Sequence, residues 1–103
     1  MLAAFSITPL GAGESVSDLV ADCVRIVRQS GLPNETNAMF TNVEGDWDEV
    51  MGVIHLCVDH VAAAAPRVSA VIKIDHRPGT EGALTGKVER LEQRLQEVDD
   101  VER

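Results

Sequence analysis

The chain contains no tyrosine and few aromatic residues of any kind, since Phe and Trp together make up 3% of its 103 residues. Hydrophobic residues nevertheless reach 45% of the chain, so the core has to be built from Val, Ile, Leu and Ala. The length is typical of one domain and is too short for two domains with separate cores. We therefore expect a single domain over residues 1–103 with an aliphatic core and a tail that frays over residues 98–103.

Basic residues are also scarce. Nine Lys and Arg residues face 17 Asp and Glu residues, which gives a formal net charge of −8. No Lys or Arg lies between Arg28 and Arg67, and this middle part of the chain is rich in carboxylates. Such a charge repels the phosphate backbone of nucleic acids. We expect no nucleic-acid partner, and the acidic middle suits a cationic or polar partner.

Long apolar runs, a leader segment and paired cysteine motifs are missing as well. No apolar run approaches the roughly 20 residues that a membrane-spanning helix needs, and the start of the chain lacks the basic region of a signal peptide. These absences predict a cytoplasmic protein without membrane insertion. Cys23 and Cys57 are the only cysteines and are not in a CxxC or paired zinc spacing, so we expect two buried free thiols.

The first half of the chain predicts a strand, a helix and a hairpin. Residues 2–8 alternate, with Ala3, Phe5 and Ile7 on the inner side, as in a half-buried strand. A helix is expected from Ser15, where Asp18 completes a near match to a capping box, and Gly31 with Pro33 ends it. Residues 34–44 then predict two short strands.

The second half predicts a helix, a strand and another helix. Asp46 as N-cap and Glu49 three residues later start a helix that Pro66 closes. Residues 68–75 alternate as a fourth strand. Leu84, Val88, Leu91, Leu95 and Val98 then follow alternately four and three residues apart in the C-terminal segment. This narrow apolar seam is typical of a helix that packs on a partner helix.

The predicted order of elements indicates an α+β fold, the ferredoxin-like split βαβ sandwich (βαββαβ) with a four-stranded antiparallel sheet and an additional C-terminal helix. Both long helices would cover one side of this sheet and leave the other side open. The outward residues of the first and last strands form a mixed polar set: Ala4, Ser6, Thr8, Val71, Lys73 and Asp75. We expect this side to meet a second subunit, a small molecule or both.

Several sequence blocks are specific enough to resemble a known family. They are Phe5–Gly11, Gly13–Ser17, Glu44–Met51, Ala65–Val68, Ile72–Asp75 and Gly86–Glu89. In this order and spacing they resemble the small thiamine-binding proteins of the MTH1187/YkoF type, over nearly the whole chain. The resemblance implies a ferredoxin-like fold, homodimers that pair into homotetramers, and binding of thiamine (vitamin B1) or its hydroxymethyl-pyrimidine moiety without catalysis or a cofactor. A carrier, a buffer or a sensor of the vitamin would each be compatible with it.

The chain departs from the family pattern in the hairpin. Where the family tends to have Thr-Pro-Met-Gly-Thr, this chain has Asn37-Ala38-Met39-Phe40-Thr41. A glycine there would let a ligand approach the backbone. Phe40 in its place either fills the pocket or supplies a stacking surface for an aromatic ring.

The chemistry of thiamine selects candidate ligand-binding residues in and near the sheet and hairpin. Asn37 carries an amide donor and acceptor for the pyrimidine edge, and Glu44 can accept a charge-assisted hydrogen bond from it. The other candidates are the short hydroxyls and the aromatic rings: Ser6, Thr8, Thr41, Phe40 and Trp47. A ring stacked on the cationic thiazolium contributes about 0.5–2 kcal/mol.

Simpler roles stay open for the same residues. Ser6 and Thr8 suit a subunit interface. Glu44 suits a solvated strand end or a part of the following helix cap, and Trp47 suits an anchor in the core. The rival function is a structural or regulatory oligomeric interaction module whose ligand pocket is closed by Phe40. An enzyme ranks last, because no Ser-His-Asp, Cys-His or Walker pattern can be assembled.

Two further ligand types are weakly indicated. His55 and Asp59 lie four residues apart on one helix face, but two ligands are too few for a metal site, so we expect none. The loop of residues 77–82, with Arg77 and the nearby His76 and Lys87, is the one basic neighbourhood, and an anion can bind near the start of the helix that follows. A simple connector is the more ordinary interpretation of this loop.

Overall fold

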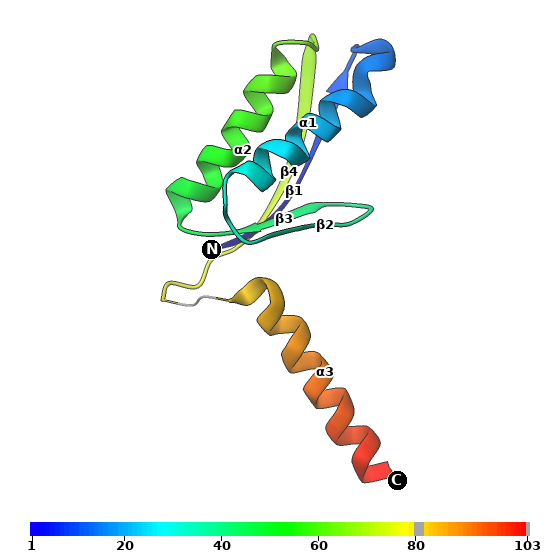
Figure 1. Ribbon diagram of the computed structural model, residues 1–103, viewed down its shortest axis with the longest axis vertical. Helices are drawn as coiled ribbons and strands as arrows, with labels where there is room; N and C mark the ends of the chain where they lie inside the picture. The colour runs from blue at the N-terminus through cyan, green and yellow to red at the C-terminus, as the bar shows by residue number, and fades with distance from the viewer. Residues whose placement is uncertain (80–81, 103) are drawn as a thin grey trace.

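The computed structural model describes residues 1–79 and 82–102, with side chains as far as residue 98. The elements follow the order expected from the sequence: β1 (Leu2–Leu10), a 3₁₀ turn (Gly13–Ser15), α1 (Val16–Gln29), β2 (Asn34–Thr36), β3 (Thr41–Glu44), α2 (Trp47–Ala62), β4 (Arg67–Asp75) and α3 (Ala83–Glu102). The strands form one antiparallel sheet in the order β2-β3-β1-β4. This is the ferredoxin-like βαββαβ arrangement, with α3 as the additional helix (Figure 1).

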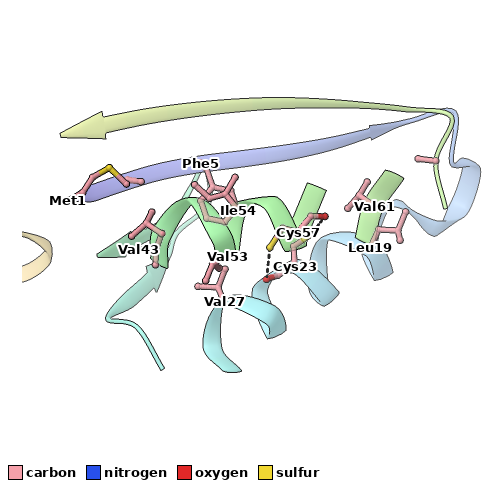
Figure 2. Close-up of a cluster of buried hydrophobic side chains, with 13 residues drawn as sticks. Met1, Phe5, Leu19, Cys23, Val27, Val43, Val53, Ile54, Cys57 and Val61 are labelled. Atoms are coloured by element: carbon pink, nitrogen blue, oxygen red, sulfur yellow. Dashed lines mark hydrogen bonds between the residues drawn. The ribbon is translucent and has the colours of Figure 1, made fainter. Parts of the chain in front are cut away.

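The strand register decides which side chains face the helices. Phe5 of β1 lies opposite Thr41 of β3 and Ile72 of β4, so these three side chains share one side of the sheet. Helices α1 and α2 lie on this side (Figures 1 and 2). The other side carries the alternate residues and is called the open face: Leu2, Ala4, Ser6, Thr8, Leu10, Asn42, Glu44, Arg67, Ser69, Val71, Lys73 and Asp75. The predicted inward and outward sets of β1 and β4 are confirmed.

The core lies between the sheet and the two helices and is almost entirely aliphatic, as predicted. Its members come from β1, β3, α1 and α2, together with Met1 before β1 and Ala65 after α2. The fully buried side chains include Val50 and, labelled in Figure 2, Val27, Val43 and Val61. Phe5 is the only aromatic residue among the buried side chains of the described chain. Both cysteines are buried and free, as expected.

The two long helices begin in different ways. At α2 the predicted capping box is present: the Asp46 backbone N–H donates to Glu49 Oε1 at 3.2 Å, and the Asp46 side chain accepts from the Glu49 backbone. The box predicted at Ser15 is wrong, because Ser15 makes no side-chain capping bond. The preceding 3₁₀ turn runs directly into α1 and leaves Ser15 with ψ of 1°, far from the extended conformation of a capping residue.

Helix α3 leads away from the body formed by the sheet, α1 and α2 (Figure 1). The Cα radius of gyration is therefore 16.6 Å, whereas a compact chain of 100 residues has about 13 Å. The predicted seam is present but uncovered, since Val88, Leu91, Leu95 and Val98 are between 45% and 57% exposed. The helix reaches Glu102. The fraying expected over residues 98–103 stays a prediction, and Arg103 lies outside the described residues. Among the described residues no helix is long and apolar enough to cross a membrane.

Candidate functional site

Four of the seven candidate ligand residues line one hollow, which we call the hairpin cavity. It has a volume of about 220 Å³ and lies between β1, α1 and the β2–β3 hairpin. The candidates that meet there are Ser6, Asn37, Phe40 and Thr41. The rest of the wall is formed by Phe5, Ile7, Val20, Cys23, Val24, Thr36, Ala38 and Met39. The hairpin thus brings together a ring, an amide and a hydroxyl at one hollow.

The cavity exists because β3 is much shorter than β1. Pairing between these strands begins at Leu2–Glu44 and ends at Phe5–Thr41, whereas β1 continues to Leu10. Beyond Phe5, β1 pairs with β4 on its other edge only, in the described part of the chain. Ser6 and Ile7 therefore contribute an unpaired strand edge to the cavity wall, and such an edge offers backbone N–H and C=O groups to a ligand.

Asn37 shapes the hairpin turn with its own side chain. Its Oδ1 accepts hydrogen bonds from the backbone N–H groups of Met39 and Phe40, each at 2.9 Å, and its backbone N–H donates to the Phe40 carbonyl, also at 2.9 Å. This Asx-type turn explains how the strands reverse without an Asn-Gly pair. The amide acceptor expected to read the pyrimidine is thus already engaged, and Nδ2 is the part of the side chain without a partner among the described residues.

Phe40 lies at the end of this turn and is half-buried. It lines the hairpin cavity, which still has a volume of about 220 Å³ beside it. Thr41, the first residue of β3, is half-buried on the helix side of the sheet and lines the same cavity. The side chain in the position of the family's glycine therefore forms part of the wall.

Glu44 occupies a different environment at the far end of β3. It is only 8% exposed, and its Oε2 accepts a hydrogen bond from the backbone N–H of Ala83, the first residue of α3, at 2.6 Å. Nearby, Lys87 of α3 forms an ion pair with Asp75 at the end of β4. These two contacts attach the start of α3 to the sheet. Neither simpler role considered for Glu44 holds, because it is buried rather than a solvated strand end and the capping carboxylates of α2 are Asp46 and Glu49.

Thr8 and Trp47 also lie away from the hairpin cavity. Thr8 is exposed on the open face, opposite Ser69 of β4. Trp47, at the start of α2, is 48% exposed and is therefore not the core anchor that we considered. Its ring contacts His76 edge-on, with 5.7 Å between the ring centroids. Trp47 thus holds the segment that connects β4 to α3.

Two smaller expectations concern ions. Arg77, Lys87 and Arg90 do surround a hollow of about 110 Å³ at the start of α3, but Glu44 and Asp75 line it too. These carboxylates already pair with the first N–H of α3 and with Lys87, so two of the groups that attract an anion are occupied. Residues 80–81 of the predicted basic loop lie outside the described residues. No cluster of three or more potential metal ligands occurs in the part of the chain that the structure describes.

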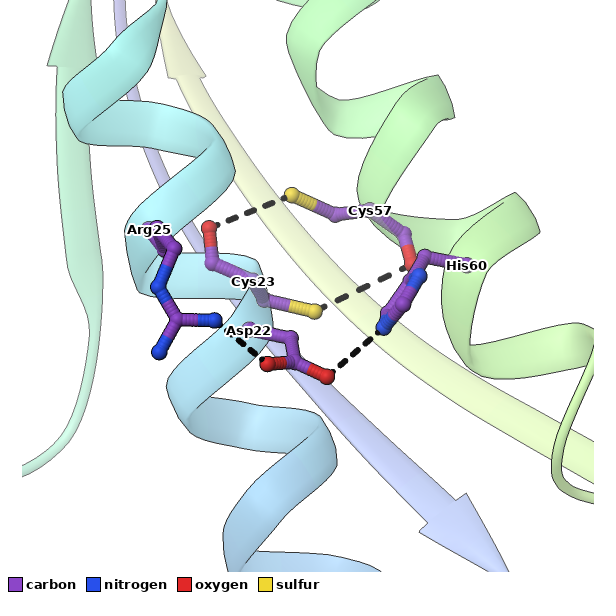
Figure 3. Close-up of polar contacts among 5 residues, drawn as sticks. All are labelled: Asp22, Cys23, Arg25, Cys57 and His60. Atoms are coloured by element: carbon purple, nitrogen blue, oxygen red, sulfur yellow. Dashed lines mark hydrogen bonds and ion pairs between the residues drawn. The ribbon is translucent and has the colours of Figure 1, made fainter.

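A polar link between α1 and α2 was not foreseen from the sequence. Asp22 Oδ2 and His60 Nε2 are 2.8 Å apart, and Asp22 Oδ1 accepts from Arg25 at 2.8 Å (Figure 3). The hydrogen bond with His60 is the main cause that lowers the pKa of Asp22; desolvation opposes it, and the hydrogen bond with Arg25 lowers the pKa further. The sequence places Asp22 next to Cys23 in α1. That His60 of α2 faces Asp22 depends on how the two helices pack, which the sequence does not show.

The chain is similar to proteins from bacteria and archaea. A family model described as thiamine-binding protein matches residues 3–92. UPF0045 protein Mb1933 of Mycobacterium bovis is 58% identical over 96 residues, which cover 92% of this chain and 94% of the relative. UPF0045 protein MJ1052 of Methanocaldococcus jannaschii is 35% identical over 91 residues, with 88% and 91% of the two chains covered.

Solved structures share the fold. The crystal structure of the hypothetical protein MJ1052 superposes with a TM-score of 0.78 at 36% identity and covers 87% of this chain and 93% of the other. A Thermotoga maritima protein, TM0486, described as a candidate thiamine biosynthesis/salvage protein, has a TM-score of 0.75 at 18% identity, with 87% and 96% covered. The second likeness concerns the fold alone. By its match to the family model over most of its length, the chain belongs to the thiamine-binding protein family.

Proposed function

We propose that the protein binds thiamine or its hydroxymethyl-pyrimidine moiety in the hairpin cavity, without catalysis, as a carrier, buffer or sensor of the vitamin. The observation that carries the proposal is the family match over residues 3–92. The name of the Thermotoga maritima neighbour, which refers to thiamine biosynthesis or salvage, agrees with it.

The size and the wall of the hairpin cavity favour the pyrimidine as the part that enters. Pockets for drug-sized ligands measure about 300–1,000 Å³, whereas this cavity measures about 220 Å³, so one ring fits better than two. Phe40 offers a ring face for stacking, and Asn37 Nδ2 offers a hydrogen-bond donor. The β1 edge at Ser6 and Ile7 offers the paired donor and acceptor that an aminopyrimidine needs. The thiazolium would remain outside, where the net charge of −8 favours a cation.

The open volume beside Phe40 also supports binding over the rival module with a closed pocket. A phenylalanine that plugged the pocket would leave no room for a ring. Phe40 instead forms one wall of the hairpin cavity while Val20 and Val24 of α1 form another. A flat aromatic ligand between such walls gains about 0.5–1.5 kcal/mol from stacking beyond the area that it buries.

Isothermal titration with thiamine, and in parallel with hydroxymethyl-pyrimidine, tests the proposal. We expect both ligands to bind in the micromolar range, with the pyrimidine contributing most of the free energy. Phe40→Leu keeps the apolar volume but loses the aromatic face, so we expect it to weaken binding by about 2- to 10-fold.

A matched pair of variants locates the site. Thr41→Val removes a hydroxyl inside the hairpin cavity, and Thr8→Val makes the same change on the open face. We expect weaker binding for Thr41→Val and unchanged binding for Thr8→Val. No heat with either ligand from folded protein would refute the function. Binding that neither Phe40→Leu nor Thr41→Val alters would refute the site and leave the function intact.

We further propose that the chain forms a homo-oligomer, a dimer or a tetramer, through the open face and the α3 seam. The seam residues Leu91 and Leu95 are 57% and 51% exposed, and nothing in the described chain packs on them. On the open face Val71 is 56% exposed beside Lys73 and Asp75. A second copy would bury the seam in a helix pair and cover these strands.

A charge introduced into the seam tests this assembly. Leu91→Glu places a carboxylate in the apolar seam, whereas Gln93→Glu adds the same charge to α3 outside it. We expect the mass measured by sedimentation velocity to fall toward that of the monomer for Leu91→Glu and to stay unchanged for Gln93→Glu. A monomeric wild-type protein would contradict the proposal.

A further inference from the structure

The two cysteines face each other across the interface between α1 and α2. Cys23 Sγ lies 3.8 Å from the backbone carbonyl oxygen of Cys57, and Cys57 Sγ lies 3.6 Å from that of Cys23 (Figure 3). Each thiol therefore lies against the backbone of the other cysteine, between the two helices at the centre of the core (Figure 2). The sequence order, with one cysteine on each helix, did not reveal this reciprocal arrangement.

The helices are held together at the same level by a polar link. Asp22 precedes Cys23 in α1 and bonds with His60 of α2, one turn along from Cys57, at 2.8 Å. The link lies on the outer side of the interface and the thiols on the inner side (Figure 3). It limits how far α1 and α2 can separate, so the thiols stay close to each other.

The two cysteines differ in their position relative to the hairpin cavity. Cys23 lines the hairpin cavity, while Cys57 is fully buried behind it. Hydrogen bonding with Cys57 lowers the pKa of the Cys23 thiol against the opposing effect of burial. Hydrogen bonding with Cys23, together with burial, raises the pKa of the Cys57 thiol. Because Cys23 lies at the cavity wall and Cys57 is fully buried, we expect Cys23 to be the thiol that ionises and reacts first, since the thiolate is the form that reacts with oxidants.

We propose that Cys23 and Cys57 form a reversible disulfide between α1 and α2 when hydrogen peroxide enters the hairpin cavity. The Cys23 thiolate attacks one peroxide oxygen, the O–O bond breaks, and the leaving hydroxide takes up a proton, which yields a sulfenic acid and water. The Cys57 sulfur then attacks the Cys23 sulfur, the S–O bond breaks, and a second water leaves with the Cys57 proton. Two thiols are oxidised and one peroxide is reduced to two waters.

The disulfide would couple the redox state of the cysteine pair to the shape of the hairpin cavity. Bond formation draws the Cys23 sulfur toward Cys57 and therefore away from the cavity wall. A thiol reductant reverses the step by thiol–disulfide exchange. The proposal concerns the cysteine pair itself and does not depend on which ligand the cavity holds.

Mass spectrometry of the full chain tests the disulfide. After treatment of the folded protein with hydrogen peroxide, we expect a loss of two hydrogen atoms, disappearance of both thiols in an alkylation assay, and full reversal by dithiothreitol. The chain has only two cysteines, so a monomeric product of this mass identifies the bond. Cys57→Ala should stop at oxygen adducts on Cys23, and Cys23→Ala should leave the buried Cys57 reduced for much longer. Two unreacted thiols, or oxygen adducts on wild-type protein without loss of hydrogen, would overturn the proposal.

A second pair of variants tests the route of the oxidant. Val20→Phe places a ring at the wall of the hairpin cavity, and Val16→Phe makes the same change one turn earlier on α1, outside it. Both valines are partly exposed, at 42% and 37%, so both variants should fold. We expect disulfide formation to be severalfold slower in Val20→Phe than in Val16→Phe. Equal rates would overturn the route through the cavity.

Discussion

Phe5→Ala is expected to lower the free energy of unfolding by about 3–5 kcal/mol. Phe5 is 2% exposed and lies at the middle of β1, where the core of the sheet meets Ile54 of α2 (Figure 2). The neighbouring core side chains are aliphatic and branched, so they cannot close the space that a lost ring leaves. The total free energy of unfolding of a domain of this size is about 5–15 kcal/mol, so the variant loses a large fraction of its stability.

Urea unfolding followed by circular dichroism measures this loss. Phe40→Ala is the matched control, because it is the same chemical change at a half-buried hairpin position. We expect its midpoint to fall much less than that of Phe5→Ala. Similar losses for the two variants would show that Phe5 is not the centre of the core.

Glu44→Ala is expected to release the start of α3 from the sheet. The Glu44 carboxylate accepts from the first N–H of α3 at 2.6 Å in a mostly buried place. A hydrogen bond to a charged group contributes about 1.5–3 kcal/mol, and an acidic group also interacts favourably with the positive end of a helix. Since α3 otherwise leads away from the body, it has few contacts that would compensate.

Two measurements follow the release of α3. Hydrogen exchange at the Ala83 amide should become faster, and the fluorescence of Trp47, the only tryptophan, should change because its ring contacts His76 in the segment before α3. Glu44→Gln keeps a hydrogen-bond acceptor and serves as the control, with a smaller effect on both readouts. Unchanged exchange at Ala83 in Glu44→Ala would contradict the role of Glu44 as an anchor.

Local sequence patterns predicted most of the helices and strands correctly. The alternation in residues 2–8 and 68–75 assigned the inner and outer sides of β1 and β4 correctly, and Asp46 with Glu49 located the start of α2. These signals depend on neighbours within one strand or one helical turn, which the sequence shows directly. The Ser15 capping box failed because the 3₁₀ turn of Gly13–Ser15 runs directly into α1 and changes the backbone at Ser15.

The structure places the candidate ligand residues in separate regions, which the sequence alone did not show. Ser6, Asn37, Phe40 and Thr41 meet at the hairpin cavity because β3 stops pairing with β1 at Phe5, and this depends on strand lengths rather than on residue type. Asn37 was expected to use its carbonyl oxygen on a ligand, but the turn already uses it.

The sequence by itself determined the elements, the aliphatic core, the acidic surface and the family, because each of these depends on composition or on short-range order along the chain. Only the tertiary structure decided that Glu44 binds the first N–H of α3, that α3 leaves its seam uncovered, and that Cys23 faces Cys57. These are contacts between residues far apart in the chain. They depend on the angles at which helices pack and on where strands end, and no periodicity within a single segment encodes either.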